Sequence, residues 1–323
     1  MISPLPSQST DQEVYVPDEQ QRPNRPIVIS VQTLLYQTPI ASIERMLDAL
    51  DNASRIGLEE GRCGGFVVTL GDGSSSRVLS DADVEDLRAR CPHVHEIKYH
   101  WFASNVGTAH GHNQMATMRD DATYLIFSNP DVVVEPRAIW RMLSVFDDPT
   151  VGFVEAKQLP IEHPKEYSSA TGETSWAATA FAMTPADLFA QLEGFDDQTF
   201  FMYCDDVDYS WRVREAGRSV VFQPAAVVFH DKDLSTEARW QPTNAEVRYS
   251  AEASLLMAHK WSRPRLLKRI LKMYDASDVG AQTAAAAEFR RRQEQGLLVE
   301  PRDPDRRIGT FVKYGYAKHR YSL

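Results

Sequence analysis

The chain has 323 residues, enough to bury a large core and to hold one enzyme-sized domain with an appendage. Apolar residues make up 43% and charged residues 25%, as in soluble globular proteins, and the net charge of -10 argues against general nucleic-acid binding. No apolar run approaches the roughly 20 residues of a membrane span, and three cysteines without a C-x-x-C pair argue against a disulfide framework. With no signal-peptide pattern at the start, we expect a cytoplasmic protein.

Residues 1–26 are rich in Pro, Gln, Ser and Asp, which predicts a flexible N-terminal arm. The continuous apolar run Ile27–Leu35 then predicts a strand buried on both faces, and Ile40–Leu50 has helical spacing. Phe66–Leu70 predicts a second buried strand that ends in a small polar loop. Because parallel strands end at the same edge of a sheet, we expect Tyr36 and Asp72 to line one crevice.

A third strand is expected over His95–Trp101, before a segment in which small residues alternate. This segment runs from Asn105 through Gly107 to Asn113 and opens a helix. Small residues let a ligand approach the backbone, and the free N–H groups of a helix start favour phosphate. The segment therefore predicts a contact with an anionic ligand.

The fourth predicted strand, Ala122–Phe127, is followed closely by an Asn-Pro-Asp turn, Asn129 to Asp131. A carboxylate in a tight turn at a strand end is placed to hold a hard cation. The alternative is an ordinary Asn-Pro-Asp turn without a ligand.

Three carboxylates, Asp205, Asp206 and Asp208, follow the aromatic run Phe200–Tyr203 and begin a helical pattern. Acids at a helix start are favoured by the helix dipole, but three of them repel one another, and partial burial raises at least one pKa. Such a group can act as a general base near neutral pH. The alternative is a capped helix with a solvated acidic edge. Two short apolar runs, Ser219–Phe222 and Ala225–Phe229, lead from there to His230.

In this order the motifs resemble those of family 2 glycosyltransferases of the GT-A type, including bacterial rhamnosyl- and galactosyl-type transferases of surface polysaccharide synthesis in the cell envelope. The resemblance spans residues 27–230 and rests on five groups of residues: the strand ends at Tyr36-Gln37 and Asp72-Gly73-Ser74, the Asn105–Asn113 segment, Asn129-Pro130-Asp131, the Gly194–Asp208 segment with its acids, and Arg212, Ala216-Gly217 and His230. It implies an inverting, metal-dependent transfer of a sugar from a nucleotide-sugar donor, a UDP-sugar or dTDP-rhamnose, to a hydroxyl of a glycan or lipid-linked acceptor.

The resemblance also implies roles for single residues. Asp206 would be the catalytic base, with Asp205 and Asp208 orienting it or binding the acceptor. Nucleotide-sugar contacts would come from Tyr36, Gln37 (where the family usually has Asn), Asp72, Asn105, Gly107, Asn113, Asn129 and Asp131. Mg²⁺ or Mn²⁺ would be held by Asp131, and His230 is the candidate for a second ligand. Acceptor contacts would come from Trp176, Asp205 and Arg212; a core position is the alternative for Trp176, and steadying the acid cluster is the alternative for Arg212.

The expected fold is a GT-A-like, Rossmann-like doubly wound mixed α/β sheet over residues 27–235, with a helical C-terminal appendage over 236–323. Helices are predicted at Asn244–Trp261, Arg263–Met273 and Gln282–Gln295. From Lys260 onward there are 15 Lys and Arg against 7 Asp and Glu, a net charge of +8. This basic region suits a peripheral contact with a membrane or a phosphate-bearing acceptor; the alternative is a solvated helical surface.

Two other functions remain open at this stage. A sugar-phosphate nucleotidyltransferase could use a similar sheet, but no Gly-rich loop with Lys or Arg follows the first strand. A non-catalytic nucleotide-sugar-binding relative would have no reason to keep three mutually repelling carboxylates. Glycosyl transfer is therefore the function that the sequence favours.

Overall fold

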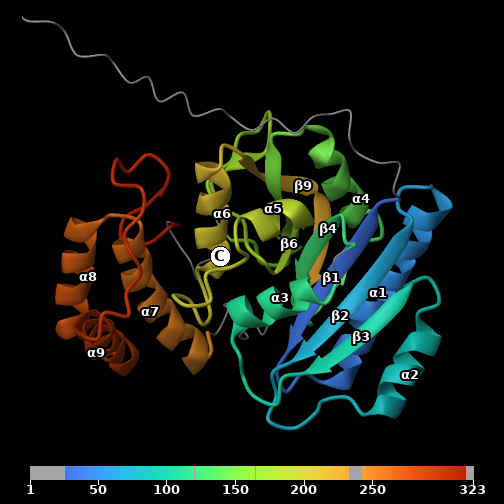
Figure 1. The fold of residues 1–323 in the computed structure, drawn as a ribbon, viewed down its shortest axis with the longest axis horizontal. Coiled ribbons are helices and arrows are strands. Elements are labelled where there is room, and N and C mark those ends of the chain that lie inside the picture. Colours follow the sequence, from blue (N-terminus) through green and yellow to red (C-terminus); the bar gives the residue numbers. More distant parts are fainter. Residues whose placement is uncertain (1–25, 120, 164, 233–241, 318–323) are drawn as a thin grey trace, which may run out of the picture.

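The computed structural model of the chain describes residues 26–317 except 120, 164 and 233–241, so nearly all of the predicted N-terminal arm lies outside it. Within these bounds the strands form one mixed nine-stranded sheet in the order β3-β2-β1-β4-β8-β6-β9-β5, with β7 paired to β9 (Figure 1). The strands are β1 (Val28–Leu35), β2 (Gly65–Asp72), β3 (Glu96–Trp101), β4 (Tyr124–Ser128), β5 (Val132–Val134), β6 (Val151–Leu159), β7 (Glu173–Thr174), β8 (Phe181–Pro185) and β9 (Ser219–His230).

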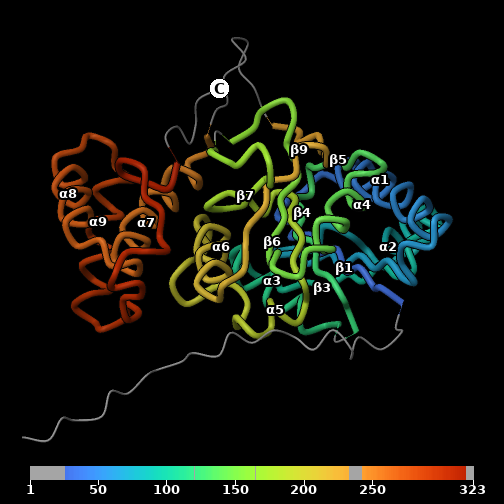
Figure 2. The backbone as a smooth tube through the Cα atoms, turned by 90° about the horizontal axis from the view of Figure 1, so that it is seen from above, coloured from blue at the N-terminus to red at the C-terminus, as the bar shows by residue number. Residues whose placement is uncertain are grey.

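Helices cover both faces of the sheet and explain why its central strands are apolar throughout. One face carries α1 (Ile40–Glu59), α2 (Asp81–Arg90) and α4 (Ala138–Leu143), and the other carries α3 (Thr108–Thr117), α5 (Ala186–Gln191) and α6 (Asp205–Glu215) (Figures 1 and 2). Every residue of β2 is buried, as expected for a parallel strand covered on both sides. The predicted doubly wound α/β sheet is confirmed.

The parallel pairing of β1 with β2 and of β2 with β3 brings their carboxyl ends to one edge. Leu35 lies opposite Asp72, and Asp72 lies opposite Trp101. The register of the sheet therefore brings the ends of β1, β2 and β3 together, while a crevice lined by Tyr36 and Asp72 stays a prediction.

One prediction about the sheet is wrong. The two runs expected at Ser219–Phe222 and Ala225–Phe229 form a single strand, β9, which is parallel to β6. The pairing shifts where Ala156 faces Gln223 and Lys157 faces Val227, next to a proline that has no N–H for the ladder. Because of this irregularity, the sequence pattern indicates two short strands where the structure has one continuous strand.

The predicted C-terminal helices are present as α7 (Asn244–Lys260), α8 (Pro264–Asp275) and α9 (Gly280–Glu294). They stand beyond α6 at one end of the molecule (Figure 2) and share a second apolar core with it. Trp211 of α6 packs edge-on against Trp261, with ring centroids 5.2 Å apart. The appendage is thus joined to the sheet domain through α6. In the described part of the chain, no helix is both long and apolar enough to cross a bilayer.

Candidate active site

The first two strand ends lie against each other at the carboxyl edge of the sheet. The backbone N–H of Gln37 donates to the Ser74 hydroxyl at 2.7 Å, while the Tyr36 side chain is exposed. The Asp72 carboxylate is fully buried and accepts hydrogen bonds from the backbone N–H groups of Ser74 and Val78 and from a tyrosine hydroxyl at 2.5 Å. Asp72 therefore shapes the loop, and its contact with a nucleotide stays a prediction.

The start of α3 docks directly onto the segment that leads into α6. Gly107 has a φ of 78°, and a Cβ there would lie 2.3 Å from the Phe201 carbonyl oxygen. The next residue, Thr108, donates its N–H to that same oxygen at 2.9 Å and its hydroxyl to Asp205 at 2.9 Å. Asn105 accepts from the Gly107 N–H at 3.1 Å. Only glycine allows this close approach, which ties the predicted phosphate-facing segment to the acids.

Asn113 holds the chain before the aromatic run instead of facing outward. Its amide donates to the Phe195 carbonyl and accepts from the Phe195 N–H, each at 2.8 Å. Gly194, with a φ of 68°, leaves room for this clamp, because a Cβ would lie 2.4 Å from the Asn113 oxygen. The structure gives Asn113 a positioning role, and its predicted contact with a nucleotide sugar has no geometric support.

The pairing of β5 with β9 brings the Asn-Pro-Asp turn to His230. Val132 lies opposite His230 in the antiparallel register, and His230 Nε2 lies 3.2 Å from the Asp131 carboxylate and 3.4 Å from the Asn129 amide nitrogen. We call Asn129, Asp131, Gln158 and His230 the strand-end cluster. The Asp131 side chain is 38% exposed and the His230 side chain 7%, so the cluster faces solvent through its carboxylate.

Gln158 fixes which ring nitrogen of His230 carries a proton. Its Oε1 lies 2.8 Å from His230 Nδ1, and its own amide donates to Glu155 at 3.5 Å. With the proton on Nδ1, the Nε2 lone pair points at an anionic carboxylate, which is repulsive unless a cation or a second proton lies between them. A carboxylate and an imidazole with a hydrogen-bonded outer nitrogen are a donor set that fits Mg²⁺ or Mn²⁺.

The strand-end cluster supplies two ionisable ligands at most. No group of three or more His, Cys, Asp or Glu side chains is arranged around a metal position among the described residues. A divalent cation at Asp131 and His230 would therefore need further oxygen ligands, which a diphosphate carries.

A lysine that the sequence analysis missed faces the same cluster. Lys232 follows His230 by two residues, and burial lowers its pKa while the charge of Asp131 opposes that effect. A cation beside Asp131 is suited to an anionic ligand.

The three carboxylates of α6, which we call the acid cluster, differ sharply in accessibility. Asp205 and Asp208 are buried, whereas Asp206 is only half-buried. Burial, helped by the charge of Asp206, raises the pKa of Asp205 to about 7. Asp206 accepts hydrogen bonds from the N–H groups of Val207 and Thr179 at 2.8 and 3.3 Å. Of the three, Asp206 has the exposure that a group acting on a substrate requires.

The roles predicted for Asp208 and Arg212 are corrected by the structure. Asp208 is completely buried and contacts Arg212 Nε at 2.8 Å, Lys260 Nζ at 2.7 Å and the Trp261 indole N–H at 3.0 Å. Arg212 is 5% exposed and also donates to the Leu192 carbonyl. Neither side chain can reach an acceptor: Asp208 joins α6 to Lys260 and Trp261 at the end of α7, and Arg212 joins α6 to the end of α5. Through its ion pair with Asp208, Arg212 steadies the acid cluster, which was the alternative prediction for this residue.

Trp176 likewise lies in the interior. It is 3% exposed, its ring packs edge-on against Tyr316 at 4.7 Å, and the Lys165 ammonium lies 3.9 Å from the ring centroid. A ring covered in this way cannot stack on a sugar, so the alternative core position describes it.

The two residues that precede β8 link the acid cluster to the strand-end cluster. Thr179 donates its N–H to Asp206, and the next residue, Ala180, accepts from the N–H of Asn129 at 3.0 Å. Together with the contact between Thr108 and Asp205, these bonds bring the start of α3, the Asp131–His230 pair and an accessible carboxylate to one edge of the sheet. This is the arrangement needed to hold an anionic leaving group and to accept a proton nearby.

Comparison with curated proteins gives three rhamnosyltransferase sequences. The chain is 24% identical to "Rhamnosyltransferase WbbL" of Escherichia coli (strain K12) over 196 residues, which cover 50% of this chain and 73% of that protein. It is 38% identical to an "N-acetylglucosaminyl-diphospho-decaprenol L-rhamnosyltransferase" of Mycobacterium tuberculosis over 61 residues, 19% of this chain and 20% of the relative. No protein-family model matches the sequence.

Solved structures give the fold. The chain superposes on GalNAc-T7, crystallised with UDP, GalNAc and Mn²⁺, with a TM-score of 0.60 at 10% identity, covering 85% of this chain and 56% of the other. It superposes on the mannosyltransferase PcManGT of Pyrobaculum calidifontis, in complex with GDP-Man and Mn²⁺, with a TM-score of 0.52 at 15% identity, covering 84% and 82%. The chain has the GT-A-like fold of these glycosyltransferases.

Proposed function

We propose that this chain, which has a GT-A-like fold, is an inverting glycosyltransferase that moves a sugar from a nucleotide-sugar donor to a hydroxyl group. The observation that carries the proposal is that hydrogen bonds of Thr179 and Ala180 connect the accessible Asp206 to the turn whose Asp131 lies 3.2 Å from His230. The rhamnosyltransferase relatives support the same reaction class.

The donor would lie across the carboxyl ends of β1, β2 and β4. The exposed side chains of Tyr36 and Gln37 are available to a nucleoside. The N–H groups of Gly107 and Thr108 are bonded to Asn105 and Phe201, so a phosphate contact at α3 would use N–H groups later in its first turn. Lys232 would add a positive charge beside Asp131. The donor class we favour is a UDP-sugar or dTDP-rhamnose, the latter because the matching relatives are rhamnosyltransferases.

Asp131 and His230 would hold a divalent cation, Mg²⁺ or Mn²⁺. Charge neutralisation on the leaving diphosphate is the chemistry that such a cation supplies when bound. The two structural neighbours were crystallised with Mn²⁺, which supports the choice of metal. Gln158 would keep His230 in the tautomer that presents Nε2.

Asp206 would act as the general base. The acceptor oxygen forms the new bond to the anomeric carbon, its proton passes to the Asp206 carboxylate, and the bond to the diphosphate breaks on the opposite face with its electron pair. Attack from that face inverts the anomeric configuration. Asp205 would make no contact with the substrate, because it is buried and accepts a hydrogen bond from the Thr108 hydroxyl.

The acceptor would be a glycan or a lipid-linked sugar. The Mycobacterium relative is named for an acceptor in which a sugar is joined through diphosphate to decaprenol, which supports the lipid-linked alternative. The basic appendage would suit a peripheral contact with a membrane that holds such a lipid.

Thermal shift with UDP, GDP, dTDP and CDP, each with and without Mn²⁺, tests the donor site. A ligand at ~100 times its dissociation constant adds about 2.7 kcal/mol of stability. We expect one or two diphosphates to stabilise the wild type only with metal. Asp131→Ala should lose this shift, and Asp231→Ala, which removes a neighbouring exposed carboxylate paired with Arg45, should keep it.

The product of turnover separates the alternatives. Release of nucleoside diphosphate from the stabilising donor supports glycosyl transfer. Release of pyrophosphate from a nucleoside triphosphate and a sugar phosphate would instead identify a nucleotidyltransferase. Binding without turnover of any donor and acceptor would identify a non-catalytic relative.

A further inference from the structure

Trp101, the last residue of β3, has an indole ring that is open to solvent. Its exposed fraction is 39%, whereas at most 3% is exposed in the four other tryptophans that the structure describes: Trp140, Trp176, Trp211 and Trp261. A large aromatic ring gains free energy when it is covered, and a ring left open at a sheet edge can be covered by a ligand. The Trp101 indole is therefore a candidate ligand contact.

The sheet register places Trp101 at the edge proposed for the donor. Trp101 lies opposite Asp72 of β2, which in turn lies opposite Leu35 of β1. The indole N–H of Trp101 donates to the Ser74 carbonyl oxygen at 2.9 Å. Because an indole has one polar hydrogen, this bond satisfies it and holds the ring in place. What the ring still offers to a ligand is its apolar, π-electron surface.

Ser74 connects Trp101 to the residues that follow β1. Its carbonyl oxygen accepts from the Trp101 indole, and its hydroxyl accepts from the backbone N–H of Gln37 at 2.7 Å. The side chains of Tyr36 and Gln37 are both exposed, whereas Ser74 is buried. Two exposed aromatic rings and an exposed amide are thus tied, through one buried serine, to the ends of adjacent strands.

The acid at this edge is already occupied by the protein. One oxygen of the Asp72 carboxylate accepts from the Ser74 N–H at 2.9 Å, and the other accepts from the Val78 N–H at 2.8 Å and the Tyr99 hydroxyl at 2.5 Å. Asp72 is also fully buried. The exposed side chains around Ser74 are therefore better placed to meet a nucleobase than this carboxylate is.

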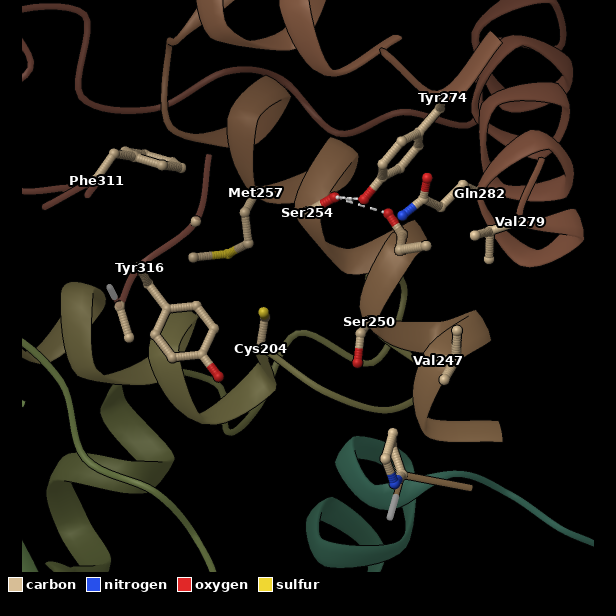
Figure 3. Close-up of a pocket in the computed structure, with 14 residues that line it drawn as sticks. Cys204, Val247, Ser250, Ser254, Met257, Tyr274, Val279, Gln282, Phe311 and Tyr316 are labelled. Carbon is tan, nitrogen blue, oxygen red and sulfur yellow. Dashed lines mark hydrogen bonds between the residues drawn. The ribbon is translucent and has the colours of Figure 1, made fainter. Parts of the chain in front are cut away.

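The cavity of about 420 Å³ beside the appendage is a poorer match for a nucleoside (Figure 3). Its lining residues lie between Cys204 and Ala317, and apolar side chains predominate among them. The hydroxyls of Ser254 and Tyr274 lie 2.8 Å apart and bond to each other (Figure 3). A nucleobase needs hydrogen-bond partners for its polar edge as well as a surface to stack on, and the strand ends offer both.

We propose that Trp101 stacks on the base of the nucleotide-sugar donor. Base–aromatic stacking tolerates any base because every base has a π-face, so Trp101 sets the affinity for the nucleotide. The exposed amide of Gln37 can bond to the polar edge of the base and so influence which base is preferred. Trp101 belongs to none of the motifs of the family resemblance, and the proposal adds it to the donor site of the proposed glycosyltransferase, on whose function it rests.

The test titrates UDP, dTDP, GDP and CDP, each with Mn²⁺, into the full chain, and follows binding by isothermal titration calorimetry and tryptophan fluorescence. Inorganic pyrophosphate, which has no base, is the control ligand. Because a base in contact with an indole quenches its fluorescence, we expect the nucleotide that binds to quench the wild type saturably and pyrophosphate to leave it unchanged. Trp101→Phe should keep most of the affinity and lose this quenching. Trp101→Ala should bind the nucleotide about 5–150-fold more weakly and pyrophosphate as the wild type does.

Tyr314→Ala is the matched control, because Tyr314 is 46% exposed and belongs to the appendage; this variant should keep both affinity and quenching. Wild-type affinity in Trp101→Ala, or quenching that persists in Trp101→Phe, overturns the stacking and leaves the proposed function in place. Failure of all four nucleotides to bind the wild type overturns both. Urea unfolding checks the fold of each variant, and if Trp101→Ala does not fold, the fluorescence of Trp101→Phe against the wild type decides.

Discussion

The same chemical change at two positions of α6 should have opposite consequences. Asp206→Asn and Asp208→Asn both remove one negative charge and keep the side-chain shape. Asp206 is half-buried and accepts from two backbone N–H groups, whereas Asp208 is fully buried among Arg212, Lys260 and Trp261. We expect Asp206→Asn to lose activity and keep its stability, and Asp208→Asn to lose stability.

The magnitudes follow from the surroundings. Breaking a buried ion pair from one side costs about 3–5 kcal/mol, because the partner charges stay buried without compensation. At Asp208 the buried Arg212 would lose its carboxylate partner, while Lys260 would keep its second ion pair, with Asp196 at 2.5 Å, so we expect the lower part of this range. This cost is a large fraction of the free energy of unfolding of a typical protein, which is about 5–15 kcal/mol. At Asp206 the loss of a general base should slow transfer by about 10²–10⁴, equivalent to about 3–5 kcal/mol in the barrier.

The assay is paired for each variant. Urea unfolding followed by tryptophan fluorescence gives the stability, and release of nucleoside diphosphate at saturating donor gives kcat. The reasoning is refuted if Asp208→Asn unfolds within about 1 kcal/mol of the wild type, or if Asp206→Asn keeps kcat within a few-fold. A drop in both quantities for Asp206→Asn would mean that its carboxylate is structural.

Three further perturbations test other parts of the site. Gly107→Ala should destabilise the fold by at least about 1–3 kcal/mol in urea unfolding, since φ 78° and ψ 169° strain any Cβ and the Phe201 carbonyl blocks it; wild-type stability would contradict the geometry. The pKa of Asp205, about 7, lies above the unfolded value, so its proton favours the folded state and that stability is lost as pH rises from about 4 through 7. Asp205→Asn should therefore gain stability relative to wild type as pH rises across that window, and a constant difference would refute the shift. Gln158→Leu should raise the Mn²⁺ concentration needed for nucleotide-dependent stabilisation by about 10–100-fold, because His230 loses its fixed tautomer, and an unchanged titration midpoint would exclude this role.

Local patterns were enough to predict β1 to β4 and where these strands end, but not β8, a central strand over Phe181–Pro185 for which no strand was predicted. Strands buried on both faces read as apolar runs, and parallel strands deliver their last residues to one edge whatever the details of packing. The pair Asp131 and His230, 99 residues apart in sequence, was implied by the family resemblance, and the antiparallel pairing of β5 with β9 brings the two side chains to 3.2 Å. Gln158 was missed, although a glutamine inside the apolar strand β6 is a signal that could have identified it.

The burial of Asp208, Arg212 and Trp176 could not be predicted, because it depends on distant segments. Lys260 and Trp261 come from the end of α7, and Tyr316 from the C-terminal region. No local sequence pattern predicts that the end of α7 and the C-terminal region pack against α6 and its neighbours. A carboxylate at a helix start looks the same in sequence whether it faces a substrate or a buried lysine.

The core shared by α6 and α7 limits how this molecule can be recombined. Replacing the appendage with helices from another transferase would strip Lys260 and Trp261 from Asp208 and uncover Trp211 in the same helix. The boundary for a working chimera therefore lies before α6, not at residue 235. Any transplant meant to change the acceptor has to carry the helix of the proposed base with it, so the two properties would be inherited together.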